Sequence, residues 1–313
     1  MQPVLVVLDH QLTVAQPALT KGVQLARAMN APVTVFVNSY SAPLVRATGN
    51  DQGKLIQART SVEHGWQARI EALLEELGSD AAGAEIRIVW GKDDRAALRE
   101  SILDVAPRML VIHAENEQSA LSRLLLTPRH WHLLRNAPCP VLCVGDTPWS
   151  GEVPVLAAVD PDHDEGRLEG LNAAIMRAAR EVSDLLDGDL KIAHVIEHPD
   201  EALILIAGEA IPSYLDTSGN LRDYYQSRLQ ALAEQAGLVG GQHVLLEGSP
   251  ASALAEYQRR HAPLLLVVGS VHRGPLRRLL LGSTAEKIVL EASGDILVVK
   301  EQDFVTPWQA SDH

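Results

Sequence analysis

Short apolar runs alternate with longer amphipathic stretches along the first half of the chain. Apolar runs rich in β-branched residues predict buried strands, and apolar residues that recur every three or four positions predict helices. The strands expected on this basis are Val4–Asp9, Pro32–Ser39, Glu85–Trp90, Met109–His113 and Val141–Val144. The expected helices are Ala15–Met29, Lys54–Leu77, Arg95–Val105 and Thr127–Leu134. Strands that alternate with helices in this way indicate a parallel sheet with helices on both faces.

Two of these helices carry further signals. The long helix expected over Lys54–Leu77 has one apolar face, made of Ile56, Val62, Ile70, Leu73, Leu74 and Leu77. The start of the helix at Thr127–Leu134 is marked by Thr127 as the cap and Pro128 at the first helical position.

The same pattern repeats in the second half, after the polar stretch DTPWSGE. The run VLAAVD at Val155–Asp160 matches VLVVLD at Val4–Asp9, and the last strands of the two halves are also similar. The further strands expected are Leu190–Ile196, His243–Leu246, Leu264–Val268 and Ile296–Val299, with helices at Leu168–Leu186, Ala202–Ala236, Ala251–Arg260 and Thr284–Glu291. An internal duplication follows. We expect a first domain over 1–146, a linker over 147–152, a second domain over 153–303 and a tail over 304–313.

Composition restricts the class of protein. The chain has 313 residues, 46% of them apolar, which is typical of packed soluble domains. Its net charge of −13 disfavours contact with a nucleic-acid backbone or an anionic lipid surface, so we expect no direct nucleic-acid partner. No apolar run approaches the roughly 20 residues of a membrane span, and no basic, apolar leader opens the sequence. Cys139 and Cys143 fit neither a disulfide framework nor a zinc motif, so we expect two small core residues in a reducing cytoplasm.

One stretch, Leu264–Glu291, carries candidate chemistry. An apolar strand ends at Gly269, a loop with Arg273, Arg277 and Arg278 follows, and Gly282-Ser283-Thr284 starts an amphipathic helix. Ser283 and Glu286 have the spacing of a capping box. A strand, a positively charged loop and the free amides of a helix start together predict an anion site.

The spacing in this stretch is more specific than its composition. Gly269, two residues, His272, nine residues and then Gly282-Ser283 resembles the nucleotide-binding signature of the universal stress proteins, with His272 in place of the second glycine. LLLTPRHWHLLRNAPCPVLCV, at Leu124–Val144, is similar to the E-type subgroup of that family. The resemblance covers nearly the whole chain. It implies two tandem adenine-nucleotide alpha hydrolase-like domains, each a five-stranded parallel sheet with helices on both faces.

The resemblance also implies a ligand and its contacts. It predicts AMP, ADP or ATP with Mg²⁺ in the second domain, where Asp160 faces the adenine and ribose. The phosphates are expected near Gly248, Gly269, His272, Arg273, Gly282, Ser283 and Thr284. Backbone amides and hydroxyls suit phosphate oxygens, and an arginine adds charge. For His272 three interpretations stay open, because its ring could hydrogen-bond a phosphate, fill the space, or belong to a loop that now only shapes the fold.

The first half lacks these features. The aligned loop carries Glu115 and Glu117, which would repel phosphate, and Pro128 removes one of the amides that a phosphate needs. We therefore expect no nucleotide in this half, and a role in packing and partner display.

Three weaker sites have competing interpretations. The carboxylates of Asp160–Glu165 could hold Mg²⁺, but capping of the following helix is the simpler expectation. His113, His130 and His132 could bind zinc only if the fold gathered them. The apolar segment Ala202–Leu215 either packs between domains or covers an apolar cavity.

No P-loop, HExxH or GxSxG motif occurs, so we expect no catalytic residue. The resemblance implies a cytoplasmic bacterial stress-response regulator that works through protein partners, as a monomer acting as a pseudo-dimer or as a homodimer. The alternative from another class is a scaffold or carrier that binds a small apolar ligand or lipid in the interdomain cleft and no nucleotide. A weak ATPase is a third interpretation.

Overall fold

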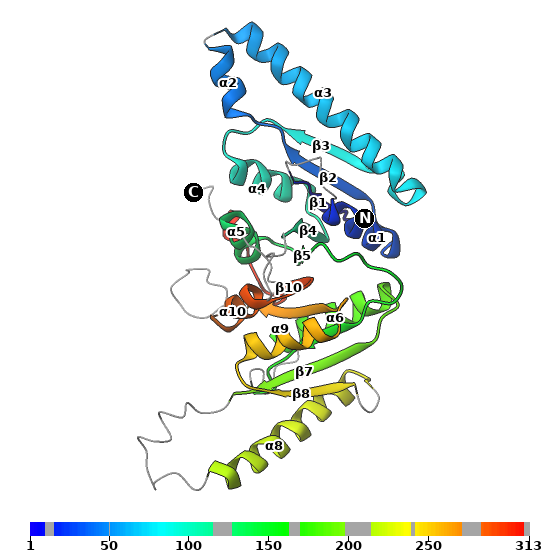
Figure 1. Cartoon of the computed structure of the whole chain (residues 1–313), viewed down its shortest axis with the longest axis vertical. Coiled ribbons are helices and arrows are strands. Elements are labelled where there is room, and N and C mark those ends of the chain that lie inside the picture. Colours follow the sequence, from blue (N-terminus) through cyan, green and yellow to red (C-terminus); the bar gives the residue numbers. More distant parts are fainter. Residues whose placement is uncertain are drawn as a thin grey trace. The chain divides into compact units, whose positions relative to one another are not determined.

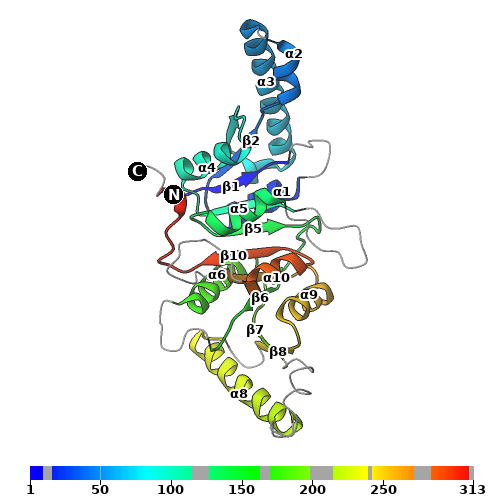
Figure 2. The same cartoon turned by 90° about the vertical axis from the view of Figure 1, so that its left-hand side faces the viewer.

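The computed structural model describes residues 1–9, 16–49, 51–114, 127–162, 170–197, 214–238, 242–270 and 283–309. These residues form two compact units, drawn in Figures 1 and 2. Unit 1 consists of the described residues between 1 and 114, between 127 and 148 and between 305 and 309. Unit 2 consists of those between 149 and 304.

Unit 1 is built on a parallel sheet in the order β3-β2-β1-β4-β5. Its strands are β1 (Val4–Val7), β2 (Val33–Asn38), β3 (Glu85–Val89), β4 (Met109–His113) and β5 (Val141–Val144). Its helices are α1 (Pro17–Ala28), α2 (Ala42–Thr48), α3 (Gln52–Glu76), α4 (Asp94–Val105) and α5 (Pro128–Asn136), with the 3-10 turn η1 (Gly78–Ala81). Helices α1 and α3 lie on one face of the sheet, and α4 and α5 lie on the other (Figure 1).

Unit 2 repeats this arrangement in the order β8-β7-β6-β9-β10, again with every described pair parallel. Its strands are β6 (Val155–Ala158), β7 (Leu190–Ile196), β8 (His243–Glu247), β9 (Leu265–Ser270) and β10 (Ile296–Lys300). Its helices are α6 (Leu171–Leu185), α8 (Tyr214–Gln235), α9 (Pro250–Arg260) and α10 (Ser283–Glu291). The predicted fold class, two tandem α/β domains with five-stranded parallel sheets, is confirmed.

The central strands supply the core of each unit. The four residues of β1 and those of β5 are buried, as are both predicted core cysteines, Cys139 and Cys143. Close helix packing on β1 depends on Gly22, because a Cβ there would lie 2.4 Å from Cγ2 of Val6. Strands buried on both faces explain why they are continuous apolar runs in the sequence.

Helix α3 differs from its prediction. Among the residues of α3, all of which the structure describes, only Ile70 is fully buried. Val62, Leu73 and Leu74 are half-buried, and Ile56 is 65% exposed. The prediction is wrong at Ile56 because the first turns of α3 extend, with α2, past the edge of the sheet (Figures 1 and 2).

The end of the chain returns to unit 1. Thr306 Oγ1 donates a hydrogen bond of 2.7 Å to the carbonyl of Asn136, at the end of α5. Trp308, in the 3-10 turn η3 (Pro307–Gln309), is buried with its ring centre 5.4 Å from that of His132. These residues therefore cover α5, although they follow the last strand of unit 2.

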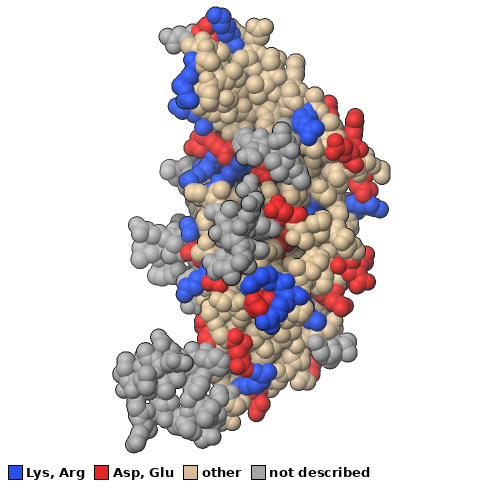
Figure 3. All heavy atoms as spheres, in the orientation of Figure 1, with Lys and Arg blue, Asp and Glu red and all other residues tan. Residues whose placement is uncertain are grey.

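The surface mixes the two signs of charge. On the face drawn in Figure 3, acidic and basic side chains lie interspersed over both units. In the described part of the chain, no helix is both long and apolar enough to cross a membrane.

Candidate functional site

Unit 2 has a cavity of about 250 Å³ at the carboxyl ends of its strands. It lies where the strand order reverses around β6, which is where ligands bind in doubly wound sheets. The residues that line it include Val159, Asp160, Leu171, Asn172, Ile175, His194, Glu197, Pro250, Leu254, Val268, Gly269, Thr284 and Ile288. The walls are mainly apolar, with a few polar groups from the ends of β6 and β7 and the starts of α6 and α10. We call this cavity the unit 2 pocket.

The end of β6 is held in place by Asn172, which is buried in the first turn of α6. The Asn172 side chain accepts a hydrogen bond from the Asp160 amide (3.1 Å) and donates one to the Asp160 carbonyl (2.6 Å). One carboxylate oxygen of Asp160 accepts the amide of Asp162 at 3.2 Å. Asp160 is thus fixed through its backbone, and its carboxylate stays at the pocket.

Gly269 packs closely against Leu171 at the pocket wall. A Cβ at this position would lie 2.5 to 2.6 Å from three side-chain carbons of Leu171. A larger residue would require the Leu171 side chain to shift, so Gly269 contributes to the close packing of β9 on α6 whether or not a ligand binds.

His194 supplies a polar group on the β7 wall. The side chain is 9% exposed, and its Nδ1 donates to the carbonyl of Val159 at 3.1 Å, since a carbonyl can only accept. Nδ1 therefore carries a proton, and the residue lines the unit 2 pocket. Helix α8 covers the ring from behind, with the Tyr225 ring centre 4.4 Å away.

The corresponding edge of unit 1 holds an ion cluster. Asp9 follows β1 as Asp160 follows β6, and by the strand register His113 in β4 corresponds to Gly269 in β9. His113 Nδ1 lies 2.5 Å from Oδ2 of Asp9, and Nε2 lies 2.8 Å from Oδ1 of Asp146. We call these three residues the His113 cluster. Asp160 faces the unit 2 pocket, whereas its counterpart in unit 1, Asp9, is bound to His113.

The geometry of the His113 cluster favours a charged ring. A neutral imidazole has one N–H, so it would direct a lone pair at one of the two carboxylates, whereas an imidazolium donates to both. Burial lowers the pKa of His113, but the hydrogen bonds and charges of Asp9 and Asp146 outweigh it and raise the pKa above its ordinary 6.5. Nearby, the buried Lys21 ammonium donates to the carbonyl of Gly145 at 2.9 Å.

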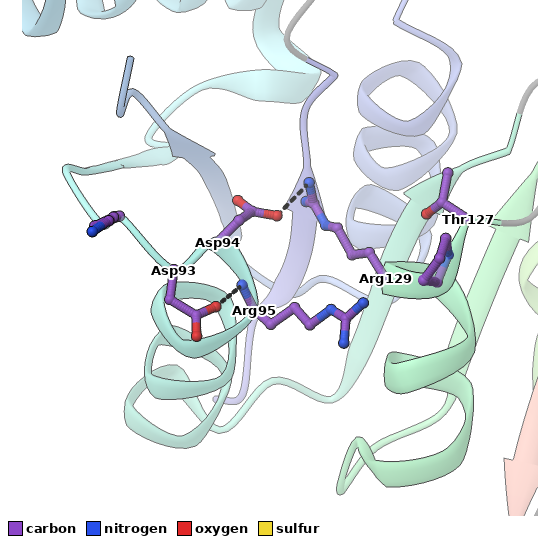
Figure 4. A pocket seen from close by; sticks show the side chains of 7 residues that line it. Asp93, Asp94, Arg95, Thr127 and Arg129 are labelled. Carbon is purple, nitrogen blue, oxygen red and sulfur yellow. Dashed lines mark hydrogen bonds and ion pairs between the residues drawn. The ribbon is translucent and has the colours of Figure 1, made fainter. Parts of the chain in front are cut away.

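The starts of α4 and α5 in unit 1 border an open depression of about 710 Å³ (Figure 4). Asp93 caps α4 by accepting the amides of Arg95 and Ala96 at 3.0 and 3.1 Å. Arg129 of α5 forms an ion pair with Asp94 across the depression, at 3.2 Å. At least one positive charge of the depression, that of Arg129, is therefore paired with a carboxylate of the same chain.

Comparison with known proteins decides the family. The model of the Universal stress protein family matches residues 1–145 and again residues 154–300. The chain belongs to the universal stress protein family. It is 25% identical to Universal stress protein E of Escherichia coli K12 over 319 aligned positions, which cover 99% of this chain and 98% of that protein.

Solved structures agree on the tandem fold of this family member. A putative universal stress protein from Pseudomonas aeruginosa UCBPP-PA14 aligns with a TM-score of 0.70 at 22% identity, covering 97% of this chain and 94% of that one. A universal stress protein from Archaeoglobus fulgidus aligns with a TM-score of 0.61 at 15% identity, covering 96% and 98%. At these identities the likeness concerns the fold alone.

The fold gathers some of the residues expected at the nucleotide site of this family. Asp160, Gly269 and Thr284 all line the unit 2 pocket. Gly248 is not among the described lining residues. It sits at the turn after β8 with φ of +114°, and its amide donates to Ile196. His272, Arg273 and Gly282 lie outside the described residues, as does the side chain of Ser283.

The expectation that the acidic cluster caps the next helix is wrong for its described members. The N-cap of α6 is Gly170, without a side-chain cap among the described residues, and Asp162 instead accepts hydrogen bonds from Tyr224 and Tyr225. Asp164, Glu165 and the apolar segment 202–213 lie outside the described residues.

The three histidines that could bind zinc make different contacts. In the described part of the chain, no three His, Cys, Asp or Glu side chains gather as a possible metal site. His130 accepts the Thr127 amide at 3.2 Å, and its pKa is lowered to about 4 by burial and then by Arg129. His132 has its pKa lowered by burial and by the charges of Arg95 and Arg99.

Sequence reasoning missed three residues of the unit 2 site: Asn172, His194 and Tyr225. A histidine inside the mostly apolar run of β7 and an asparagine in the first turn of an amphipathic helix were available signals. Tyr225 gave none, because it meets His194 only through the packing of α8 on the sheet.

Proposed function

We propose that the chain is a non-catalytic stress-response regulator that binds an adenine nucleotide in the unit 2 pocket. The observation that carries this is the meeting of Asp160, Gly269 and Thr284 around one cavity. These three residues lie far apart in the sequence, and the resemblance to the family predicts all three as nucleotide contacts.

The chemistry of the pocket fits the parts of a nucleotide. Apolar side chains such as Leu171, Ile175 and Ile288 provide walls for a base, and Asp160 provides an acceptor for ribose hydroxyls. The start of α10 at Thr284 supplies the electropositive end of a helix for phosphate oxygens. The cavity bounded by described residues is slightly smaller than the roughly 300–1,000 Å³ typical of ligand sites. It is suited to the nucleoside, and the phosphates, with Mg²⁺, would extend along the start of α10.

Unit 1 is proposed to bind no nucleotide and to serve packing and partner contacts. Its counterpart of Asp160 is engaged by His113, and that cluster fills the edge of the sheet with hydrogen-bonded side chains. Thr127 caps the amide of His130 at the start of α5, where Pro128 has no amide to offer. A phosphate would have to displace these contacts.

Isothermal titration with ATP and Mg²⁺ tests the proposal. We expect micromolar binding by the parent protein and at least a tenfold loss in Thr284→Trp, whose indole would fill the mouth of the pocket. Leu290→Trp is the matched control, since Leu290 lies on the same helix, is 50% exposed and does not line the pocket. A His272→Gly variant, titrated alongside, reports whether that histidine obstructs the site.

The outcomes separate the interpretations. Binding by the parent that Thr284→Trp abolishes and Leu290→Trp keeps supports the proposal. No binding by the parent, together with binding by His272→Gly, would mean that the site exists but is closed. No binding by either the parent or His272→Gly would contradict nucleotide binding.

A carrier of small apolar ligands is the second candidate, and the mainly apolar walls of the unit 2 pocket favour it. Mass spectrometry of an organic extract of the purified protein tests it. A lipid-like molecule that is retained by the parent and lost in Thr284→Trp would support the carrier function, and its absence from the parent would count against it.

A further inference from the structure

We infer that helix α8 is coupled to the unit 2 pocket through Asp162, so that nucleotide binding and the docking of α8 on the sheet stabilise each other. The residues that make this connection are Asp162, Tyr224, Tyr225 and Arg228, which we call the Asp162 latch. The inference rests on the proposed nucleotide site and adds a means of regulating it.

Asp162 accepts hydrogen bonds from two tyrosines of α8. Tyr225 donates its hydroxyl to Oδ2 at 2.8 Å, and Tyr224 donates its hydroxyl to Oδ1 at 3.1 Å. Loss of solvent and the Asp162 carboxylate raise the pKa of Tyr225 to about 12, so the hydroxyl remains a donor over the physiological pH range. Both oxygens of this carboxylate are thus bound to the same helix.

Arg228 adds charge and a backbone contact to the latch. Its Nε lies 3.5 Å from Asp162 Oδ1, and its Nη2 donates to the carbonyl of Pro161 at 2.8 Å. Its Nη1 donates to the Tyr224 hydroxyl at 2.8 Å, and the guanidinium lies 5.4 Å from the centre of the Tyr224 ring. Arg228, one helical turn from the two tyrosines, therefore contacts both the Pro161–Asp162 loop and Tyr224, which binds that loop.

The latch reaches the pocket by two separate routes. One runs along the loop, because the amide of Asp162 donates to the carboxylate of Asp160, which lines the pocket. The other runs through the ring of Tyr225, which packs against His194 on the β7 wall. Tyr225 takes part in both routes, since its hydroxyl binds the loop and its ring supports the wall.

Coupling follows from this geometry. A ligand that contacts Asp160 and the β7 wall restrains the loop that carries Asp162 and also the ring of His194. Helix α8 docks on both of these. By linkage, a docked α8 must favour the ligand to the same extent. Among the residues of α8 with described side chains, Leu229 and Ala233 are the buried ones. The latch adds to the polar contacts that Arg222 makes with Glu247 and Gln226 makes with His243. A helix with little buried surface is the kind of element whose docking a ligand can shift.

The test uses the full chain with the double substitution Tyr224→Phe and Tyr225→Phe, which removes both hydroxyls and keeps the aromatic rings. Asp162→Asn, which removes the charge opposite Arg228, is the second variant. Tyr257→Phe on α9 is the matched control, because it makes the same chemical change in the same unit outside the latch. Melting curves verify that every variant is folded.

Two measurements are made on each protein. The first is the ATP affinity in the presence of Mg²⁺, for which we expect about a tenfold loss in both latch variants, within the usual range of couplings between sites, and no change in Tyr257→Phe. The second is hydrogen exchange of α8 with and without ATP, where we expect ATP to slow exchange in the parent and in the control but not in the latch variants.

Each result decides the inference. Equal ATP affinity in the parent and the latch variants would overturn the coupling. So would hydrogen exchange of α8 that is the same with and without ATP in the parent. Either result would leave the proposed nucleotide site intact. No ATP binding by the parent would overturn the proposed function, and the coupling with it. A purely structural role of the latch would lower the melting temperature without changing the response of α8 to ATP.

Discussion

Removal of the His113 side chain should destabilise unit 1 in a way that depends on pH. The ring is 5% exposed and donates to two carboxylates, Asp9 and Asp146, whose side chains are 42% and 56% exposed. In His113→Asn the shorter amide cannot span both acceptors. The two carboxylates are then left near one another without the cation between them.

The size of the effect follows from the two hydrogen bonds. A hydrogen bond to a charged group contributes roughly 1.5–3 kcal/mol net when it is buried. Because both carboxylates are half exposed, solvent screens them and the lower end of that range applies. We expect His113→Asn to lower the free energy of unfolding by about 3 kcal/mol when the histidine is charged, and by about half of that when it is neutral and keeps one donor.

The sign of the pH dependence follows from the raised pKa of His113. A group whose pKa is higher in the folded state binds its proton more tightly there than in the unfolded chain. Its stabilising contribution is complete below the unfolded value of about 6.5 and is lost as the pH rises through the folded value. The difference between parent and variant should therefore be largest on the acidic side.

Urea unfolding followed by circular dichroism, at about pH 6 and about pH 9, measures that difference on both sides of the titration. Hydrogen exchange of β4 amides assigns the change to unit 1. His64→Asn, an exposed position on α3, is the control and should change little at either pH. A difference that is constant with pH, or that grows with it, would refute the charged His113 cluster.

Three further substitutions test the packing at two glycines and one buried hydrogen bond. Gly188→Ala should destabilise unit 2 by about 3 kcal/mol or more, because its Cβ would lie 1.9 Å from the carbonyl oxygen of Val153. Gly65→Ala in α3 should instead stabilise the protein by up to about 1 kcal/mol, since no described atom would lie within 4 Å of its Cβ. Urea unfolding decides both, and equal effects would contradict the steric reasoning. Trp149→Phe should cost about 2 kcal/mol by removing the indole donor from buried Asp295, 2.5 Å away. A melting temperature equal to the parent's would show that the bond contributes little.

The sequence predicted the fold well because its signals are local. Strands buried on both faces are continuous apolar runs, and the repetition of VLVVLD as VLAAVD marked the duplication without any knowledge of contacts. The strand order of unit 2 then repeats that of unit 1.

Failures of prediction occurred where a side chain's neighbours are distant in the sequence. Asp162 was expected to serve the helix that follows it, yet its partners are 62 and 63 residues further on. Ile56 fits the helical period of α3, but periodicity cannot tell where the sheet beneath a helix ends.

The candidate site was predicted in outline only. Ligands bind at the carboxyl ends of strands in doubly wound sheets, so Asp160, Gly269 and Thr284 could be grouped in advance from their positions after predicted strands and at a predicted helix start. The same pattern could not reveal that His113 occupies the matching place in unit 1, because its two partners are 104 and 33 residues away.

The return of residues 305–309 to unit 1 makes the two halves of the chain difficult to separate. A cut in the linker before Val153 would divide the sequence between the repeats, but not the packed units. The second fragment would carry Trp308 without the α5 surface that buries it, and the first would expose His132 and the end of α5. The first repeat, taken alone, therefore lacks residues that complete its surface, because those residues follow the last strand of the second repeat.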